Sequence, residues 1–140
     1  MNGGLTRTAG VVDLSENEIA REIVDAAFQI HQRLGPGLLE SVYEIVLAYE
    51  LKKRGLKVIR QVAVPISWDD LHFDEAFRAD LLAEDKVIVE LKSKEKVIPV
   101  DKKQVLTHLR LADKRLGLLI NFGEELIKNG ITRIVNGLEE

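Results

Sequence analysis

The residues best suited to chemistry are two acids and a lysine in the middle of the chain. Asp80 is followed ten residues later by Glu90, and Lys92 comes two residues after Glu90. Side chains alternate across a β-strand, so Glu90 and Lys92 share one face of an extended segment. Carboxylate oxygens suit Mg²⁺ or Mn²⁺, and a lysine beside the ion can orient water or stabilise charge on a phosphate. The spacing predicts either a metal-dependent site acting on phosphate or an ordinary cross-strand salt bridge.

Two further pairs of polar residues lie at helical spacing. Glu40 and Tyr43 are three residues apart, shortly after Gly35-Pro36-Gly37, and Gln104 and His108 are four residues apart. Residues at these spacings share one face of an α-helix. A glutamate near a helix start is often only a favourable dipole contact, and Gln/His pairs are usually solvated. Each pair is therefore a candidate for the site that also has an ordinary structural interpretation.

Three helices are expected to carry or support these side chains. Ser15 and Glu18 form a capping box, and the apolar stripe that follows predicts an amphipathic helix ending near Leu34. Gly55 stands where a left-handed C-terminal cap belongs. The other two helices are expected over 38–54 and, with Asp101 as cap, over 102–115.

Between the second and third helices the pattern is extended. Segments 77–82 and 86–92 are expected to pair as a hairpin through 83–85, which brings Asp80 opposite or diagonal to Glu90. Pro65 indicates an edge strand or a strand end. The order of elements predicts an α/β (α+β) domain in which helices flank a mixed sheet. The remaining extended segments are 58–66, 116–121 and 131–135.

Length and composition limit the possible classes of protein. A chain of 140 residues suits one domain, expected over 15–140 after a loose lead-in at 1–14. With 46% hydrophobic and 31% charged residues, disordered and collagen-like chains are excluded. The absence of Cys excludes disulfides, a thiolate nucleophile and a sulfur-bound zinc site. No apolar run reaches the length of a membrane span, so no membrane partner is expected, and the cytoplasm is the expected compartment.

Charge is distributed unevenly, although the net charge is only −3. Segment 52–60 carries five basic residues and no acid, and 86–115 carries nine basic residues against four acids. Segment 69–85 instead carries seven acids and one arginine. Such runs are usually solvated faces, but the two basic segments also suit contact with a phosphate backbone.

One stretch carries a resemblance to a known family. Gly37-Leu38-Leu39-Glu40-Ser41-Val42-Tyr43 matches the signature that names the GxxExxY proteins, a prokaryotic branch of the PD-(D/E)XK nuclease superfamily. The chain resembles this family from about Ile19 to Val135, including Gln61, Arg78-Ala79-Asp80 and the segment 117–123. The resemblance implies a PD-(D/E)XK nuclease-like core, with a central mixed four-stranded sheet flanked by helices.

The resemblance also implies roles for individual residues. It implies a metal site made by Asp80 and Glu90 and supported by Glu40, with Lys92 as the catalytic lysine and Gln104 beside the metal or the substrate. Two positions depart from the pattern, since Ala79 replaces the proline of the superfamily name and His108 stands where relatives tend to have tyrosine. Weaker contacts to substrate are expected from Tyr43, Arg78, Lys52, Lys53 and His108.

The function expected from these observations is metal-dependent hydrolysis of phosphodiester bonds in nucleic acid, DNA rather than RNA, with Mg²⁺ or Mn²⁺. The alternative is a catalytically silent module that keeps the nuclease fold and binds nucleic acid or protein. A third hypothesis, an antitoxin-like regulatory partner, has no positive feature in the sequence. A homo-oligomer is compatible with all three.

Overall fold

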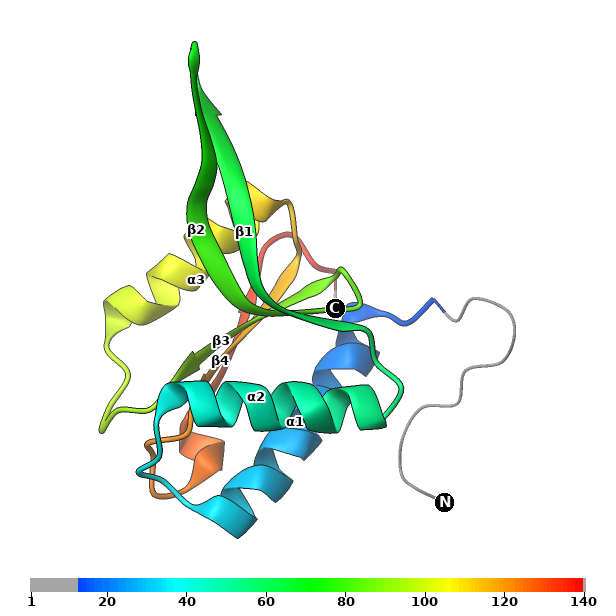
Figure 1. Cartoon of the computed structure of the whole chain (residues 1–140), viewed down its shortest axis with the longest axis vertical. Coiled ribbons are helices and arrows are strands. Elements are labelled where there is room, and N and C mark those ends of the chain that lie inside the picture. The colour runs from blue at the N-terminus through cyan, green and yellow to red at the C-terminus, as the bar shows by residue number, and fades with distance from the viewer. Residues whose placement is uncertain (1–12, 140) are drawn as a thin grey trace.

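A mixed sheet of five strands runs through the structure, a computed structural model that describes residues 13–139 (Figure 1). The strands follow one another across the sheet in chain order, and only the β3–β4 pair is parallel. The resemblance implied four strands, and the structure corrects this number because the last short segment pairs with β4. The strands are β1 (Val58–Trp68), β2 (Leu71–Ala83), β3 (Val87–Lys92), β4 (Leu116–Asn121) and β5 (Ile131–Val135).

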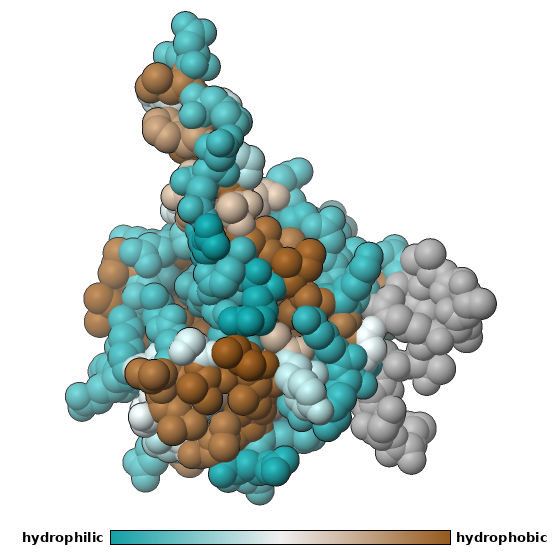
Figure 2. Space-filling model, viewed as in Figure 1, coloured by the Kyte–Doolittle hydropathy of each residue, from teal (hydrophilic) through white to brown (hydrophobic). Residues whose placement is uncertain are grey.

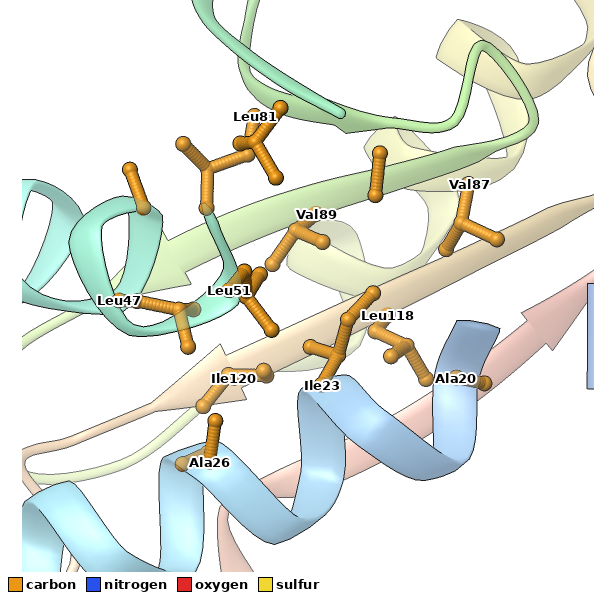
Figure 3. Close-up of a cluster of buried hydrophobic side chains, with 14 of the residues drawn as sticks. Ala20, Ile23, Ala26, Leu47, Leu51, Leu81, Val87, Val89, Leu118 and Ile120 are labelled. Carbon is orange, nitrogen blue, oxygen red and sulfur yellow. The ribbon is translucent and has the colours of Figure 1, made fainter. Parts of the chain in front are cut away.

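Helices cover both faces of the sheet. Helices α1 (Glu16–Leu34) and α2 (Glu40–Lys53) pack on one face, and α3 (Pro99–Ala112) packs on the other. Figure 3 shows the larger core, in which Ile23 and Leu51 of the two helices meet Val89 of β3. A short helix, η1 (Ile127–Asn129), precedes β5. Within residues 13–139, no helix has both the length and the apolarity that a membrane crossing requires.

The capping box at the start of α1 is confirmed. The Glu18 backbone N–H donates to Ser15 Oγ at 3.1 Å, and the Ser15 N–H donates to Glu18 Oε1 at 3.1 Å. Leu14, just before the cap, is buried in the core. Most of the expected lead-in, residues 1–12, lies outside the described residues.

The start of α3 differs from the expectation. The helix begins at Pro99 rather than at 102, since proline needs no N–H partner in the first turn and its φ angle suits a helix. Asp101 lies within the first turn, where its carboxylate accepts from the Ile98 N–H at 2.9 Å. The helix ends at Ala112, and Asp113 adopts a left-handed conformation with φ 56°.

Strands β1 and β2 are longer than the sequence predicted. They continue to a turn at Asp69 and Asp70 and form a ribbon that projects from the rest of the domain (Figure 1). The pairing shifts register between Val64 and Ile66, around Pro65, and β1 is an edge strand as expected. The sequence did not predict strands over the whole ribbon, because the ribbon contains acidic residues such as Asp74 and Glu75, in which strands are depleted.

Helix α2 carries apolar residues both on its solvent-exposed side and on the side that faces the core. Leu39, Val42, Ile45 and Tyr49 are exposed there, whereas Tyr43, Leu47 and Leu51 face the core. Figure 2 shows apolar surface gathered over the N-terminal part of this helix. The sequence pattern of α2 therefore does not by itself indicate which side packs on the sheet.

Candidate active site

The site begins where β2 and β3 separate. The two strands pair only from Leu81–Val89 to Ala83–Val87, and Asp80 is the first residue of β2 beyond this pairing. The Asp80 side chain is buried, and its Oδ2 accepts from the Leu91 backbone N–H at 2.8 Å. The carboxylate thus takes up a strand N–H at the point where backbone pairing between β2 and β3 ends.

Glu90, on β3, lies beside Asp80 of β2. Burial, followed by the charge of Asp80 and hydrogen bonding with that carboxyl, raises the pKa of Glu90 to about 8, although Lys92 acts in the opposite direction. Glu90 and Lys92 are both partly buried. Val89, before Glu90, and Leu91, between Glu90 and Lys92, point to the other face of the sheet and belong to the larger core. The structure therefore brings together the two acids and the lysine that the spacing singled out.

His108 of α3 closes one side of this group. Its ring stacks on Phe77 with centroids 4.0 Å apart, and its Nδ1 lies 3.9 Å from Glu90 Oε2. Both of these atoms are buried, and neither has a hydrogen-bond partner among the described residues. Burial, and then the charge of Lys92, lowers the pKa of His108. Two buried polar atoms, one of the His108 imidazole and one of the Glu90 carboxyl, therefore face each other with unused hydrogen-bonding capacity.

Helix α2 adds two further acids. Glu40, the first residue of α2, is an exposed residue at the border of the group, since the Leu38 carbonyl just before the helix accepts from Ser93 Oγ just after β3 at 2.6 Å. Partial burial of the Glu40 carboxyl, and then the charge of Asp80, raise its pKa. Glu44, one turn later, is buried and binds Arg60 Nη2 at 2.9 Å and Gln61 Nε2 at 2.6 Å. Glu44 is not among the site residues predicted from the sequence, although its spacing of four residues from Glu40 puts both on one helix face.

Comparison with known families identifies this fold. A family model described as the PD-(D/E)XK nuclease superfamily matches residues 17–134. The chain belongs to the PD-(D/E)XK nuclease superfamily. No match was found among curated proteins or among solved structures. Membership of the GxxExxY branch stays a prediction from the sequence.

Tyr43 has a different place in this PD-(D/E)XK domain from the one expected. It is fully buried and stacks on Phe122 with centroids 4.4 Å apart, so it does not face a substrate. Its hydroxyl donates to the Gly35 carbonyl at 2.5 Å and accepts from the Leu38 N–H at 3.2 Å. Tyr43 therefore holds the loop before α2 in place through two hydrogen bonds. Gly37 in this loop has φ 106°, which glycine adopts without strain. By holding the loop, Tyr43 helps to position Glu40 at the start of α2.

Four other expected site residues of this PD-(D/E)XK domain have exposed side chains. Gln104 is exposed one turn before His108. Arg78 is exposed on the β1–β2 ribbon and binds Glu75 at 2.5 Å. Lys52 is exposed twelve residues after Glu40 in the same helix, about 18 Å along its axis, and Lys53 follows it. The structure therefore separates Lys52 and Lys53 from Asp80 and Glu90, while a role for Gln104, one turn from His108, or for Arg78, two residues before Asp80, stays a prediction from the sequence.

The carboxylates fit the divalent cation that PD-(D/E)XK nucleases typically use. Glu90 Oε2 is buried without a partner beside a second carboxyl, an arrangement that a cation relieves. Within residues 13–139, no three acidic or histidine side chains already form a complete metal-binding cluster. Mg²⁺ is usually held by one or two carboxylates together with water and phosphate oxygens. Asp80 and Glu90 suit such an ion, with Glu40 at the border of the site.

The raised pKa of Glu90 predicts how stability depends on pH in metal-free protein. Folded Glu90 keeps its proton up to a pH of about 8, whereas an unfolded glutamate loses it near pH ~4.3. Between these values the folded state binds more protons, so the free energy of unfolding should fall as pH rises, by at most about 1.4 kcal/mol per pH unit. We expect melting in EDTA to show this decline and Glu90→Gln to flatten it. Identical pH profiles for the two proteins would contradict the assignment.

Proposed function

We propose that this chain hydrolyses phosphodiester bonds in nucleic acid with a divalent cation held by Asp80 and Glu90. One observation carries the proposal: a buried, unpartnered oxygen of Glu90 lies in a group that also contains Asp80 and Lys92. A salt bridge alone would not account for it, because the single lysine charge leaves Glu90 with a pKa of about 8. Membership of a superfamily of nucleases supports the same conclusion.

The residues of the chain have separate tasks in this proposal. Mg²⁺ or Mn²⁺, when bound, lowers the pKa of a water molecule and offsets charge on the scissile phosphate. Asp80 and Glu90 hold the ion, and Glu40 orients a water molecule at the border of the site. Lys92, on the same strand face as Glu90, positions the nucleophile and stabilises charge on the phosphate.

The arrangement of basic residues favours one side of the domain for the nucleic acid. Lys96, Lys102 and Lys103 lie between the end of β3 and the first turn of α3, and they form no ion pair within the described part of the chain. Other members of the two basic segments are neutralised, such as Arg54 by Asp25 at 2.7 Å and Arg60 by Glu44. Neither basic segment is therefore a continuous positively charged surface. The side of the domain formed by the β3–α3 loop and the start of α3 is the better surface for phosphate contacts.

This choice of surface can be tested by salt dependence. Replacing Lys102 and Lys103 together with alanine should weaken nucleic-acid binding and reduce the slope of log affinity against log salt by about 1.8 for duplex DNA. The matched double variant at Lys52 and Lys53 should have a smaller effect, because those lysines lie at the far end of α2 from Glu40. Equal slopes for the Lys102/Lys103 variant and the wild type would contradict the proposed path.

The alternative function is a silent module that binds nucleic acid or protein without turnover. Incubation of the purified chain with DNA and RNA, each single- and double-stranded, in Mg²⁺, Mn²⁺ or EDTA separates the two. Cleavage in metal and none in EDTA is expected, while binding without cleavage in every metal would favour the alternative. DNA as substrate, a homo-oligomer and a cytoplasmic location stay predictions from the sequence.

A further inference from the structure

Gln61 has a backbone conformation that is unusual for its position in β1. Its φ angle is 55°, in the left-handed region that residues with a Cβ rarely adopt. It lies inside the paired part of the strand, between Arg60 and Val62, which are both in register with β2. Strain at such a position is a reason to look for a function of the side chain. The other non-glycine residues with positive φ in the described part of the chain lie in turns or after α3: Asp69, Glu84, Asp85 and Asp113.

This conformation is linked to where the Gln61 side chain lies. Successive side chains of a strand normally point to opposite faces. Arg60 and Gln61 nevertheless bind the same carboxylate, since Arg60 Nη2 lies 2.9 Å from Glu44 Oε2 and Gln61 Nε2 lies 2.6 Å from Glu44 Oε1. The left-handed residue allows two neighbouring side chains to converge on one acid of α2.

The same amide nitrogen of Gln61 also lies 3.3 Å from Asp80 Oδ1. An amide nitrogen carries two hydrogens and both of its partners are carboxylate oxygens, so the partners determine the orientation of the amide. Glu44 is only 5% exposed and is also held by Arg60, which makes it a fixed anchor. Asp80 is thus held at Oδ1 by Gln61 and at Oδ2 by the Leu91 N–H.

We propose that Gln61 is a positioning residue that, anchored on Glu44, holds the Asp80 carboxylate in the orientation in which it binds the metal ion. This inference rests on the proposed function, in which Asp80 is a metal ligand. Gln61 acts through Asp80 and does not itself bind the ion. Removing a residue that orients a metal ligand typically weakens metal binding about 10- to 100-fold.

Gln61→Gly tests this role without threatening the fold. Glycine adopts the left-handed conformation without steric cost, so the melting temperature in EDTA should fall only by the contribution of the two part-buried hydrogen bonds of Gln61 to Glu44 and Asp80. Calorimetric titration with Mn²⁺ should give a Kd at least about tenfold weaker than that of the wild type. In cleavage assays kcat should fall while KM for nucleic acid changes little, since the amide holds a ligand and not the substrate.

Asp69→Gly is the matched control, because it makes the same backbone change in the turn of the β1–β2 ribbon. This variant should bind Mn²⁺ with wild-type affinity. Unchanged Mn²⁺ affinity in Gln61→Gly would overturn the positioning role and leave the proposed function standing. A wild-type chain that binds no Mn²⁺ would overturn both proposals.

Discussion

Lys92→Met should lower the turnover of nucleic acid at least about a hundredfold, the loss typical of removing a positioned group that stabilises charge or transfers a proton. Methionine keeps much of the apolar bulk of the lysine side chain and removes only its charge, so the fold should persist. Lys92 lowers the pKa values of Glu90 and Glu40 in the metal-free protein. Without it the acids repel each other more, and metal binding should persist or strengthen.

The measurement is single-turnover cleavage at saturating metal, with Lys96→Met as control. Lys96 is an exposed lysine of the loop that follows β3. Its substitution should affect nucleic-acid binding more than the rate of the bound complex. A Lys92→Met variant that cleaves at the wild-type rate would show the catalytic assignment to be wrong, even though the fold assignment stands.

Glu90→Ala should have the largest effect on activity, with loss of metal-dependent cleavage by at least about three orders of magnitude if Glu90 holds the ion. The variant should not be unstable in EDTA, because it removes a buried carboxyl whose Oε2 has no partner among the described residues and which lies beside Asp80. Mn²⁺ binds only the folded state, so it should raise the melting temperature of the wild type and not that of Glu90→Ala.

Glu95→Ala is the control for this prediction. Glu95 is an exposed acid only five residues further along the chain, so its replacement removes an acidic side chain from the same segment without touching the site. Wild-type cleavage and a wild-type metal effect are expected. An equal loss of cleavage activity in Glu90→Ala and Glu95→Ala would contradict the role of Glu90 as a metal ligand, because any acid of this segment would then have the same effect.

Much of the framework could be predicted because it depends on local patterns. Segment 116–121 is a strand with the predicted limits, since its apolar run can only be buried from both sides. The capping box at Ser15 likewise indicated the beginning of α1 to within a residue. The alternation of Val89, Glu90, Leu91 and Lys92 put acid and lysine on one face because the strand is regular there.

Other features depend on contacts between distant segments and could not be predicted in the same way. The role of Tyr43 follows from stacking on Phe122 and from a loop carbonyl eight residues before it. The bridge from Glu44 through Gln61 to Asp80 depends on one left-handed residue inside β1, which no periodicity indicates. The separation of Lys52 from the site depends on which end of α2 meets the strand ends.

The most direct test of the metal site is anomalous diffraction at the manganese edge from crystals soaked in Mn²⁺. The strongest anomalous peak is expected between the carboxylates of Asp80 and Glu90, with no peak at the same place in Glu90→Ala crystals. A wild-type crystal whose anomalous peaks all lie elsewhere, or that has none, would contradict a divalent cation held by these two residues.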